Sequence, residues 1–140
     1  MERFQFAEKS ARRSCAAPLV VAMVPNSYES KARIFVQIAA YRDPECQPTV
    51  ADLFAKAAHP RRVTVGVCWQ HLPEEDSDLF VRRYPFPSQV RVLKVDARKS
   101  QGACWARAKV QALHRGEEYT LQIDSHMRFE PGWDDALIAM

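Results

Sequence analysis

The sequence predicts an α/β domain in which a mainly parallel sheet carries helices on both faces. Apolar segments rich in β-branched residues alternate along the chain with segments of helical periodicity, which is typical of this class. The first of these segments is apolar at almost every position, as expected of a strand that is covered on both sides. Three of the predicted strands end in polar residues, which is where open α/β sheets place their ligands.

The first predicted strand spans residues 34 to 40 and ends at Tyr41 and Arg42. Asp43 is expected to cap the following helix, with Pro44 at its first position. Apolar residues recur in that helix at spacings of three and four, which indicates one buried stripe. They are Val50, Leu53, Phe54 and Ala57, and His59-Pro60 is expected to end the helix.

Three further strands are predicted, at residues 63 to 69, 90 to 95 and 119 to 123. The strand at residues 90 to 95 ends at Asp96. A helix is expected to open at Gly102, to pack through small side chains and to stop at Arg115-Gly116. A short helix is expected at residues 79 to 84. A last helix begins at Asp134 or Asp135, and the chain ends within it, as in a truncated domain.

Length and composition set limits on the protein's class. With 140 residues the chain forms one domain, and residues 1 to 32 are expected to be an irregular N-terminal extension of a domain at 33 to 140. An apolar stretch at residues 16 to 24 is too short for a membrane span and contains Pro18. The net charge of +3 is slight and its basic residues are dispersed, so nucleic acid is not an expected partner.

Four cysteines lie far apart in the sequence, at positions 15, 46, 68 and 104. No Cys-x-x-Cys pair occurs, so a zinc cluster is not predicted. Such sparse cysteines favour a reducing compartment, although two disulfides remain an alternative. We therefore expect a cytoplasmic protein, with the secretory pathway as the less favoured location.

The motif Asp124-Ser125-His126 follows the last predicted strand. On an extended backbone Asp124 and His126 project to one face and Ser125 to the other. A carboxylate and an imidazole that converge at a strand end are suitable ligands for a divalent cation such as Mn²⁺. A lone Asp-x-His is more often a turn-capping aspartate beside an unrelated histidine. Its place at the end of a strand that looks buried favours the metal site.

A diphosphate is the ligand that best accompanies such a cation here. The sequence contains neither G-x-G-x-x-G nor G-x-x-x-x-G-K, so it has no dinucleotide or P-loop fingerprint. Backbone N–H groups near Gly102, at the predicted start of a helix, would share a diphosphate's charge with the cation. Arg107, one turn into that helix, would add a charge-assisted contact, with a solvated helix residue as the alternative.

Four blocks of the sequence, in order, resemble the polypeptide α-N-acetylglucosaminyltransferase family, whose members have the GT-A fold, a Rossmann-type sheet. The blocks are Ile38-Ala39-Ala40-Tyr41-Arg42-Asp43, Val67-Cys68-Trp69-Gln70, Gly102-Ala103-Cys104-Trp105-Ala106-Arg107, and Leu121 to Phe129 with Pro131-Gly132-Trp133-Asp134. The resemblance covers roughly residues 33 to 135, which would be the nucleotide-sugar-binding half of such a domain.

The resemblance implies a metal-dependent transfer of N-acetylglucosamine from UDP-GlcNAc to a hydroxyl of an acceptor polypeptide, with hydroxyproline as the acceptor in the best-known members. It places Asp124 and His126 on the family's metal-binding Asp-x-His. It places the strand-end residues Tyr41, Arg42, Asp43 and Asp96 near the uridine and ribose, and Gly102 and Arg107 near the diphosphate. In the family the third metal ligand and the acceptor-binding half lie beyond the position of Met140.

No carboxylate pair in the sequence suits a double displacement, which favours front-face attack on the sugar, steered by the leaving phosphate. Two other functions remain as alternatives. In the first alternative, the chain is a non-catalytic remnant that binds a nucleotide sugar without transferring it. Less favoured is a papain-like cysteine peptidase, because residues 102 to 106 overlap that family's signature around Cys104. Gln101 replaces the leading cysteine of that signature, and only His114 and His126 follow it.

Overall fold

A computed structural model of the chain describes residues 32 to 76 and 86 to 140. The predicted short helix at 79 to 84 and, apart from residue 32, the predicted N-terminal extension lie outside the described residues. Within the described ranges no helix is both long enough and apolar enough to cross a membrane.

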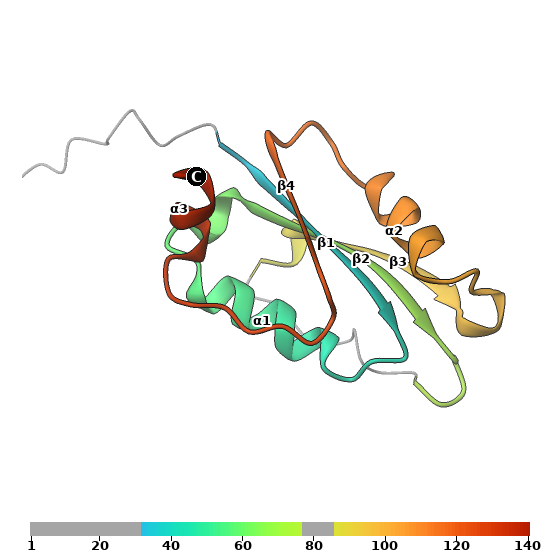
Figure 1. The fold of residues 1–140 in the computed structure, drawn as a ribbon. Helices are drawn as coiled ribbons and strands as arrows, with labels where there is room; N and C mark the ends of the chain where they lie inside the picture. Colours follow the sequence, from blue (N-terminus) through green and yellow to red (C-terminus); the bar gives the residue numbers. More distant parts are fainter. Residues whose placement is uncertain (1–31, 77–85) are drawn as a thin grey trace, which may run out of the picture.

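The core of the fold is a four-stranded sheet in which every strand is parallel to its neighbours (Figure 1). Its strands are β1 (Ile34–Tyr41), β2 (Val63–His71), β3 (Val90–Asp96) and β4 (Tyr119–Ile123), in the order β3-β2-β1-β4. All four predicted strands are confirmed, each within two residues of its expected end. The parallel sheet brings the carboxyl ends of all four strands to one edge.

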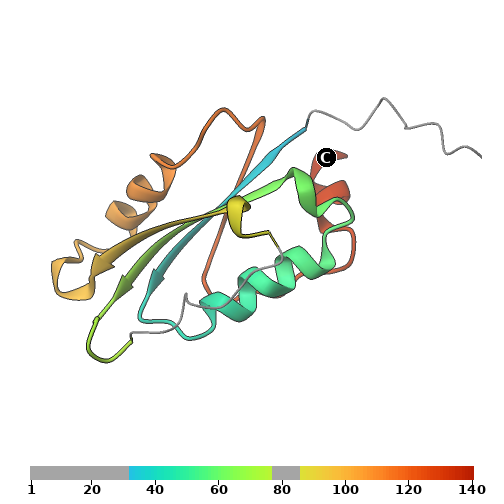
Figure 2. The ribbon, with the colours of Figure 1, turned by 180° about the vertical axis from the view of Figure 1, so that it is seen from behind.

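Helices cover both faces of this sheet, as the sequence predicts (Figures 1 and 2). They are α1 (Cys46–Lys56), α2 (Ala103–Gln111) and the short α3 (Trp133–Ile138). In the described part of the chain, single turns of 3-10 helix lie at Pro60–Arg62, Pro87–Gln89 and Ala97–Lys99. The sheet and its flanking helices therefore confirm the predicted fold class.

Three predicted helix ends are wrong, and one of them is the end of α1, which lies at Lys56 rather than at His59-Pro60. Asp43 does not cap α1, because its carboxylate accepts a hydrogen bond from the backbone nitrogen of Glu45 and forms a turn before the helix begins at Cys46. The helix α2 ends at Gln111 rather than Arg115. Its last turn tightens there through i→i+3 bonds, which run from the backbone nitrogens of Leu113 and His114.

The buried side chains of β1 and β2 alternate between the two faces. One set packs with α1 and α3, and the other packs with α2. The α1 face contains Ile34, Val36, Ile38, Val50, Leu53, Phe54, Val63, Val65 and Val67, whereas the α2 face contains Phe35, Cys68, Ala106 and Val110. This two-sided burial explains why the sequence of β1 is apolar at nearly every position.

The strand β4 differs from its prediction, because it is not buried. It pairs with β1 along one side and forms an edge of the described sheet, and Tyr119, Thr120 and Gln122 are exposed. Only Leu121 and Ile123 are partly covered, where they pack against the α1 face. The alternation of apolar residues in β4 therefore reflects a strand that is covered on one side only.

The segment that follows β4 runs along α1 and is fastened to it at several points (Figure 1). The buried Thr49 hydroxyl donates to the carbonyl oxygen of Ser125 at 2.8 Å and accepts from the backbone nitrogen of Met127. Further along, Asp52 accepts from the backbone nitrogen of Phe129, and the Trp133 indole donates to the Leu53 carbonyl. These bonds hold the Asp-Ser-His turn in place at the start of α1.

Candidate functional site

The sheet gathers most of the predicted site residues at its carboxyl edge. Tyr41 ends β1, Asp96 ends β3, and the motif 124–126 follows β4. Because β1 lies between β2 and β4, residues that follow β1 have neighbours on both sides. The edge therefore divides into a part between β1 and β4 and a part between β1 and β2.

Asp124 lies opposite Arg107 in the first of these parts. The distance between Arg107 Nη2 and Asp124 Oδ1 is 3.5 Å, and both side chains are largely exposed. The sequence placed these two residues at one site by separate arguments, and the structure brings them together. An exposed carboxylate beside a guanidinium forms a mixed-charge surface that suits a cation and an anion bound side by side.

His126 lies against Asp43, which follows β1. Its Nδ1 is 3.1 Å from Asp43 Oδ2, and the Ser125 hydroxyl donates to the same oxygen at 2.5 Å. Burial raises the pKa of the Asp43 carboxyl, but hydrogen bonds from Ser125, His126 and the Glu45 nitrogen outweigh it and hold that pKa below its ordinary value. Asp43 therefore stays an acceptor, with three donors around it.

This arrangement corrects the expected alternation of the motif. The strand ends at Ile123 and residues 125 and 126 form a turn, so the period-two rule no longer applies. Ser125 and His126 do not point to opposite faces but reach one oxygen of Asp43. A turn, rather than an extended backbone, sets the direction of the imidazole.

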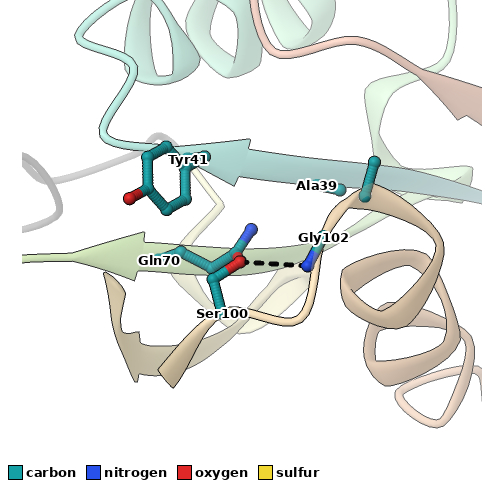
Figure 3. Close-up of a pocket in the computed structure, with 6 residues that line it drawn as sticks. Ala39, Tyr41, Gln70, Ser100 and Gly102 are labelled. Carbon is teal, nitrogen blue, oxygen red and sulfur yellow. Dashed lines mark hydrogen bonds between the residues drawn. The ribbon is translucent and has the colours of Figure 1, made fainter. Parts of the chain in front are cut away.

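A pocket of about 120 Å³ occupies the part of the edge between β1 and β2 (Figure 3). Tyr41 and Gly102, both predicted site residues, line it. The remaining lining residues are Ala39, Gln70, Ser100 and Ala103. Complete small-molecule sites measure roughly 300–1,000 Å³, so this pocket encloses one part of a ligand only.

A chain of hydrogen bonds shapes the floor of this pocket. The buried Gln70 amide donates to the carbonyl oxygen of Ala40 and accepts from the Ser100 hydroxyl. Ser100 Oγ in turn lies 3.3 Å from the backbone nitrogen of Gly102, the residue before α2 (Figure 3). Gly102 has a φ of +94°, a backbone conformation that favours glycine. These bonds tie the start of α2 to the ends of β1 and β2.

Two of the residues predicted to bind substrate form local ion pairs in this structure. Arg42, whose φ is +49°, pairs with Glu75 and Asp76, and Asp96 pairs with Arg98. The side-chain and backbone hydrogen bonds from Arg98 lower the pKa of Asp96 to about 2. Asp96 thereby caps the 3-10 turn that follows β3.

Sequence reasoning missed three residues of this edge: Ser125, Gln70 and Ser100. Ser125 is buried although it stands between two exposed residues of the motif. A buried polar side chain must find a partner, but the sequence does not reveal which one. For Gln70 the sequence offers one signal, because its amide stands at the end of an apolar strand. A buried amide at that position requires two hydrogen-bond partners.

The donor set is suitable for a divalent cation but is small. Among the described residues, no group of three or more histidine, cysteine, aspartate or glutamate side chains converges as a complete metal shell. Asp124 offers exposed carboxylate oxygens, and within the described part of the chain no hydrogen-bond partner contacts Nε2 of His126. A carboxylate and an imidazole are each donor types that Mn²⁺ accepts, but in this structure Asp124 contacts Arg107 whereas His126 contacts Asp43.

Cys104, the nucleophile of the peptidase alternative, is exposed and lies in the first turn of α2. The two histidines that follow it are engaged elsewhere: His114 Nε2 contacts the Glu117 carbonyl oxygen, and His126 contacts Asp43. No described hydrogen bond joins Cys104 to an imidazole, which is the pairing that activates a thiol in such enzymes.

A parallel α/β sheet with charged side chains and a pocket at its carboxyl edge defines a ligand-binding α/β protein. The family model described as Glycosyltransferase (GlcNAc) matches residues 33–84 and 77–140, so the chain belongs to this family of glycosyltransferases. Comparisons with curated proteins and with solved structures found no match. Family membership confirms the resemblance read from the sequence and favours a transferase over a peptidase.

Proposed function

We propose that the protein binds UDP-GlcNAc together with a divalent cation, with Mn²⁺ the best-suited ion, and transfers N-acetylglucosamine to a hydroxyl of an acceptor polypeptide. The observation that carries this proposal is the meeting of Asp124 and Arg107 at the carboxyl edge of a sheet in a GlcNAc glycosyltransferase family member. Hydroxyproline is the acceptor that we propose to test first.

Each part of the edge has a role in this proposal. Asp124 and His126 would hold the cation, and Arg107 would contact the diphosphate. The backbone nitrogens at the start of α2 would add to the diphosphate site, because a helix N-terminus favours anions. The pocket lined by Tyr41 and Gly102 has room for one ring of the nucleotide.

The chemistry requires that a charged UDP leave as the sugar bond breaks. A bound cation supplies Lewis-acid stabilisation of that leaving group. Arg107 adds positive charge at the same place, where negative charge increases in the transition state. The leaving phosphate then steers an acceptor hydroxyl to the same face of the sugar, with retention of configuration.

We also propose a cytoplasmic location. Each cysteine in the described ranges, at positions 46, 68 and 104, is a free thiol. Burial raises the pKa of Cys46 to about 12, so that thiol is protonated and unreactive at neutral pH. Free thiols are typical of proteins in reducing compartments.

Calorimetric titration of UDP in Mn²⁺ and in EDTA tests the cation site. We expect tight binding only with Mn²⁺, and a loss of at least about tenfold in Asp124→Asn and in His126→Ala. The matched control is Asp135→Asn with His59→Ala, an exposed carboxylate–imidazole pair at 3.7 Å beyond the opposite end of α1. Equal UDP binding in EDTA, or unchanged binding in both site variants, would contradict the proposal.

A transfer assay separates the enzyme from the non-catalytic alternative. UDP-GlcNAc is incubated with matched acceptor peptides that contain hydroxyproline, serine or proline, and product is measured by mass spectrometry. We expect a mass increase of one N-acetylhexosamine on the hydroxyproline peptide and none on the proline peptide. Metal-dependent UDP binding without transfer to any of the peptides would assign the chain to the donor-binding remnant.

A further inference from the structure

We infer that Asp43 is a positioning residue for His126: it holds the proton of the imidazole on Nδ1 and so presents the Nε2 lone pair to the cation at the end of β4. This inference rests on the proposed function for the cation. It gives Asp43 a role different from the contact near the uridine and ribose that the family resemblance implies.

The first step of the argument is the set of donors around Asp43. Its Oδ1 accepts from the backbone nitrogen of Glu45 at 2.9 Å, and its Oδ2 accepts from the Ser125 hydroxyl at 2.5 Å. The same Oδ2 is 3.1 Å from His126 Nδ1. A carboxylate can only accept hydrogen bonds, so the Nδ1 of a neutral imidazole must carry the proton in this contact.

The second step concerns the other ring nitrogen. In a neutral imidazole only one nitrogen carries a proton, so a proton on Nδ1 leaves a lone pair on Nε2. The His126 side chain is 64% exposed, whereas that of Asp43 is only 20% exposed. Most of the His126 side chain is therefore open to solvent, although its Nδ1 contacts Asp43. Histidine ligands in metal sites generally donate their second N–H to a carboxylate in this way.

The third step is that Asp43 is itself held rigidly. It lies between the end of β1 at Tyr41 and the start of α1 at Cys46, and the backbone bond from Glu45 fixes its carboxylate. Thr49 of α1 holds the carbonyl oxygen of Ser125 from the same side. Asp43 is thus held by the turn before α1, and the residue next to His126 is held by α1, although Asp43 and His126 are 83 residues apart in sequence.

Asp43 is also not among the residues that line the pocket in which a nucleotide ring would bind. The pocket is formed by the ends of β1 and β2 and the start of α2. Its side chain turns toward the segment that follows β4, on the other side of β1. Its Oδ2 is thus shared by Ser125 and His126 rather than directed at the pocket.

The tautomer is measured directly by ¹H–¹⁵N NMR of the imidazole side chains at about pH 8, where histidines are generally neutral. In the metal-free wild-type chain we expect His126 to carry its proton on Nδ1. We expect Asp43→Ala to lose this preference, and Asp43→Asn to retain it, because its amide oxygen can still accept from Nδ1. A wild-type His126 with its proton on Nε2 would overturn the inference without need of any variant.

Mn²⁺ binding, measured by calorimetry without nucleotide, gives the second readout. We expect Asp43→Ala to weaken Mn²⁺ binding about 10- to 100-fold, which is the usual effect of losing a carboxylate behind a histidine ligand. We expect Asp43→Asn to recover most of this loss. Ser125→Ala removes the neighbouring donor but leaves the His126 contact, so its effect should be smaller than that of Asp43→Ala.

The matched control is Asp52→Ala. Asp52 is also an α1-side carboxylate that fastens the segment after β4, through the backbone nitrogen of Phe129, but it does not contact His126. We expect it to lower thermal stability without changing the tautomer or the Mn²⁺ affinity. A tautomer change as large in Asp52→Ala as in Asp43→Ala would show that general loosening is the cause, and would overturn the inference.

The two proposals fail in different ways. If His126→Ala abolishes Mn²⁺ binding but Asp43→Ala changes neither the tautomer nor the affinity, the cation site stands and the role of Asp43 is refuted. If the wild-type chain does not bind Mn²⁺, the proposed cation site is refuted, and with it the purpose that we assign to Asp43.

Discussion

Arg107 and Asp124 face each other at the carboxyl edge of the sheet, with 3.5 Å between Nη2 and Oδ1. Their side chains are 41% and 63% exposed, so this ion pair contributes little to stability. The guanidinium can therefore leave the carboxylate for a stronger anion at low cost. A surface of this kind is suited to a ligand that brings its own diphosphate and cation.

Replacing Arg107 tests this relationship. We expect Arg107→Ala to weaken Mn²⁺-dependent UDP binding about 10- to 100-fold, because one charge-assisted contact is lost. Arg107→Lys should be intermediate, since it keeps the charge but loses the planar fork. Lys109→Ala, the same loss of charge on the same helix, is the control and should bind UDP nearly as the wild type does. Equal losses in both alanine variants would indicate a general charge effect.

Gly66 allows α2 to pack closely on the sheet. A Cβ atom at this position would lie 2.5 Å from Phe35 Cζ and 3.1 Å from Val110 Cγ1. We expect Gly66→Ala to lower the free energy of unfolding by about 1–3 kcal/mol through overpacking, measured by urea denaturation. The shorter side chain of Phe35→Leu should relieve part of this cost in the double variant. Additive losses in the double variant would contradict this explanation.

Asp134 holds the end of α1 and is fully buried. Its carboxylate accepts hydrogen bonds from the backbone nitrogens of Ala58 and His59 and from Arg62. We expect Asp134→Ala to cost about 3–5 kcal/mol of unfolding free energy, because it removes the buried partner of Arg62 and leaves two backbone N–H groups without their acceptor. Asp135→Ala, at the exposed partner of the same Arg62, should cost less than about 1 kcal/mol. Similar losses of unfolding free energy in Asp134→Ala and Asp135→Ala would refute the view that the buried carboxylate contributes more than the exposed one.

Glu117 makes stability depend on pH. Burial raises the pKa of this carboxyl, but hydrogen bonds from the Arg115 nitrogen and from Arg91 outweigh it, so the pKa lies below its ordinary value of 4.5. The folded chain therefore binds this proton less readily than the unfolded chain does. The stability that Glu117 contributes is present above the ordinary pKa and is lost as the pH falls through the lowered one.

We therefore expect the gap in unfolding free energy between the wild type and Glu117→Gln to be largest above about pH 5. The gap should shrink as the pH falls below 4.5, measured by urea denaturation between pH 3 and pH 7. A gap that does not change with pH would show that the Glu117–Arg91 pair contributes through packing alone.

Much of the fold was predictable because its signals are local. The apolar run of β1 and the helical period of α1 are properties of consecutive residues, and both elements form, although α1 is shorter than expected at both ends. The exposure of β4 was not predictable, because Leu121 and Ile123 give the same alternation in an edge strand as in a central one. Strand order and neighbours decide burial, and they depend on residues far away in the chain.

At the candidate site, too, some features were predictable from the sequence and others were not. From sequence alone, Asp124, His126 and Arg107 are recognisable as candidate ligand residues, because a parallel sheet must bring its strand ends to one edge. Only the tertiary structure decides what each one touches: Asp43 meets His126, and Gln70 meets Ser100, across gaps of 83 and 30 residues. Side-chain type and strand periodicity are properties of neighbouring residues, whereas the partner of a polar group is set by packing that the whole chain determines.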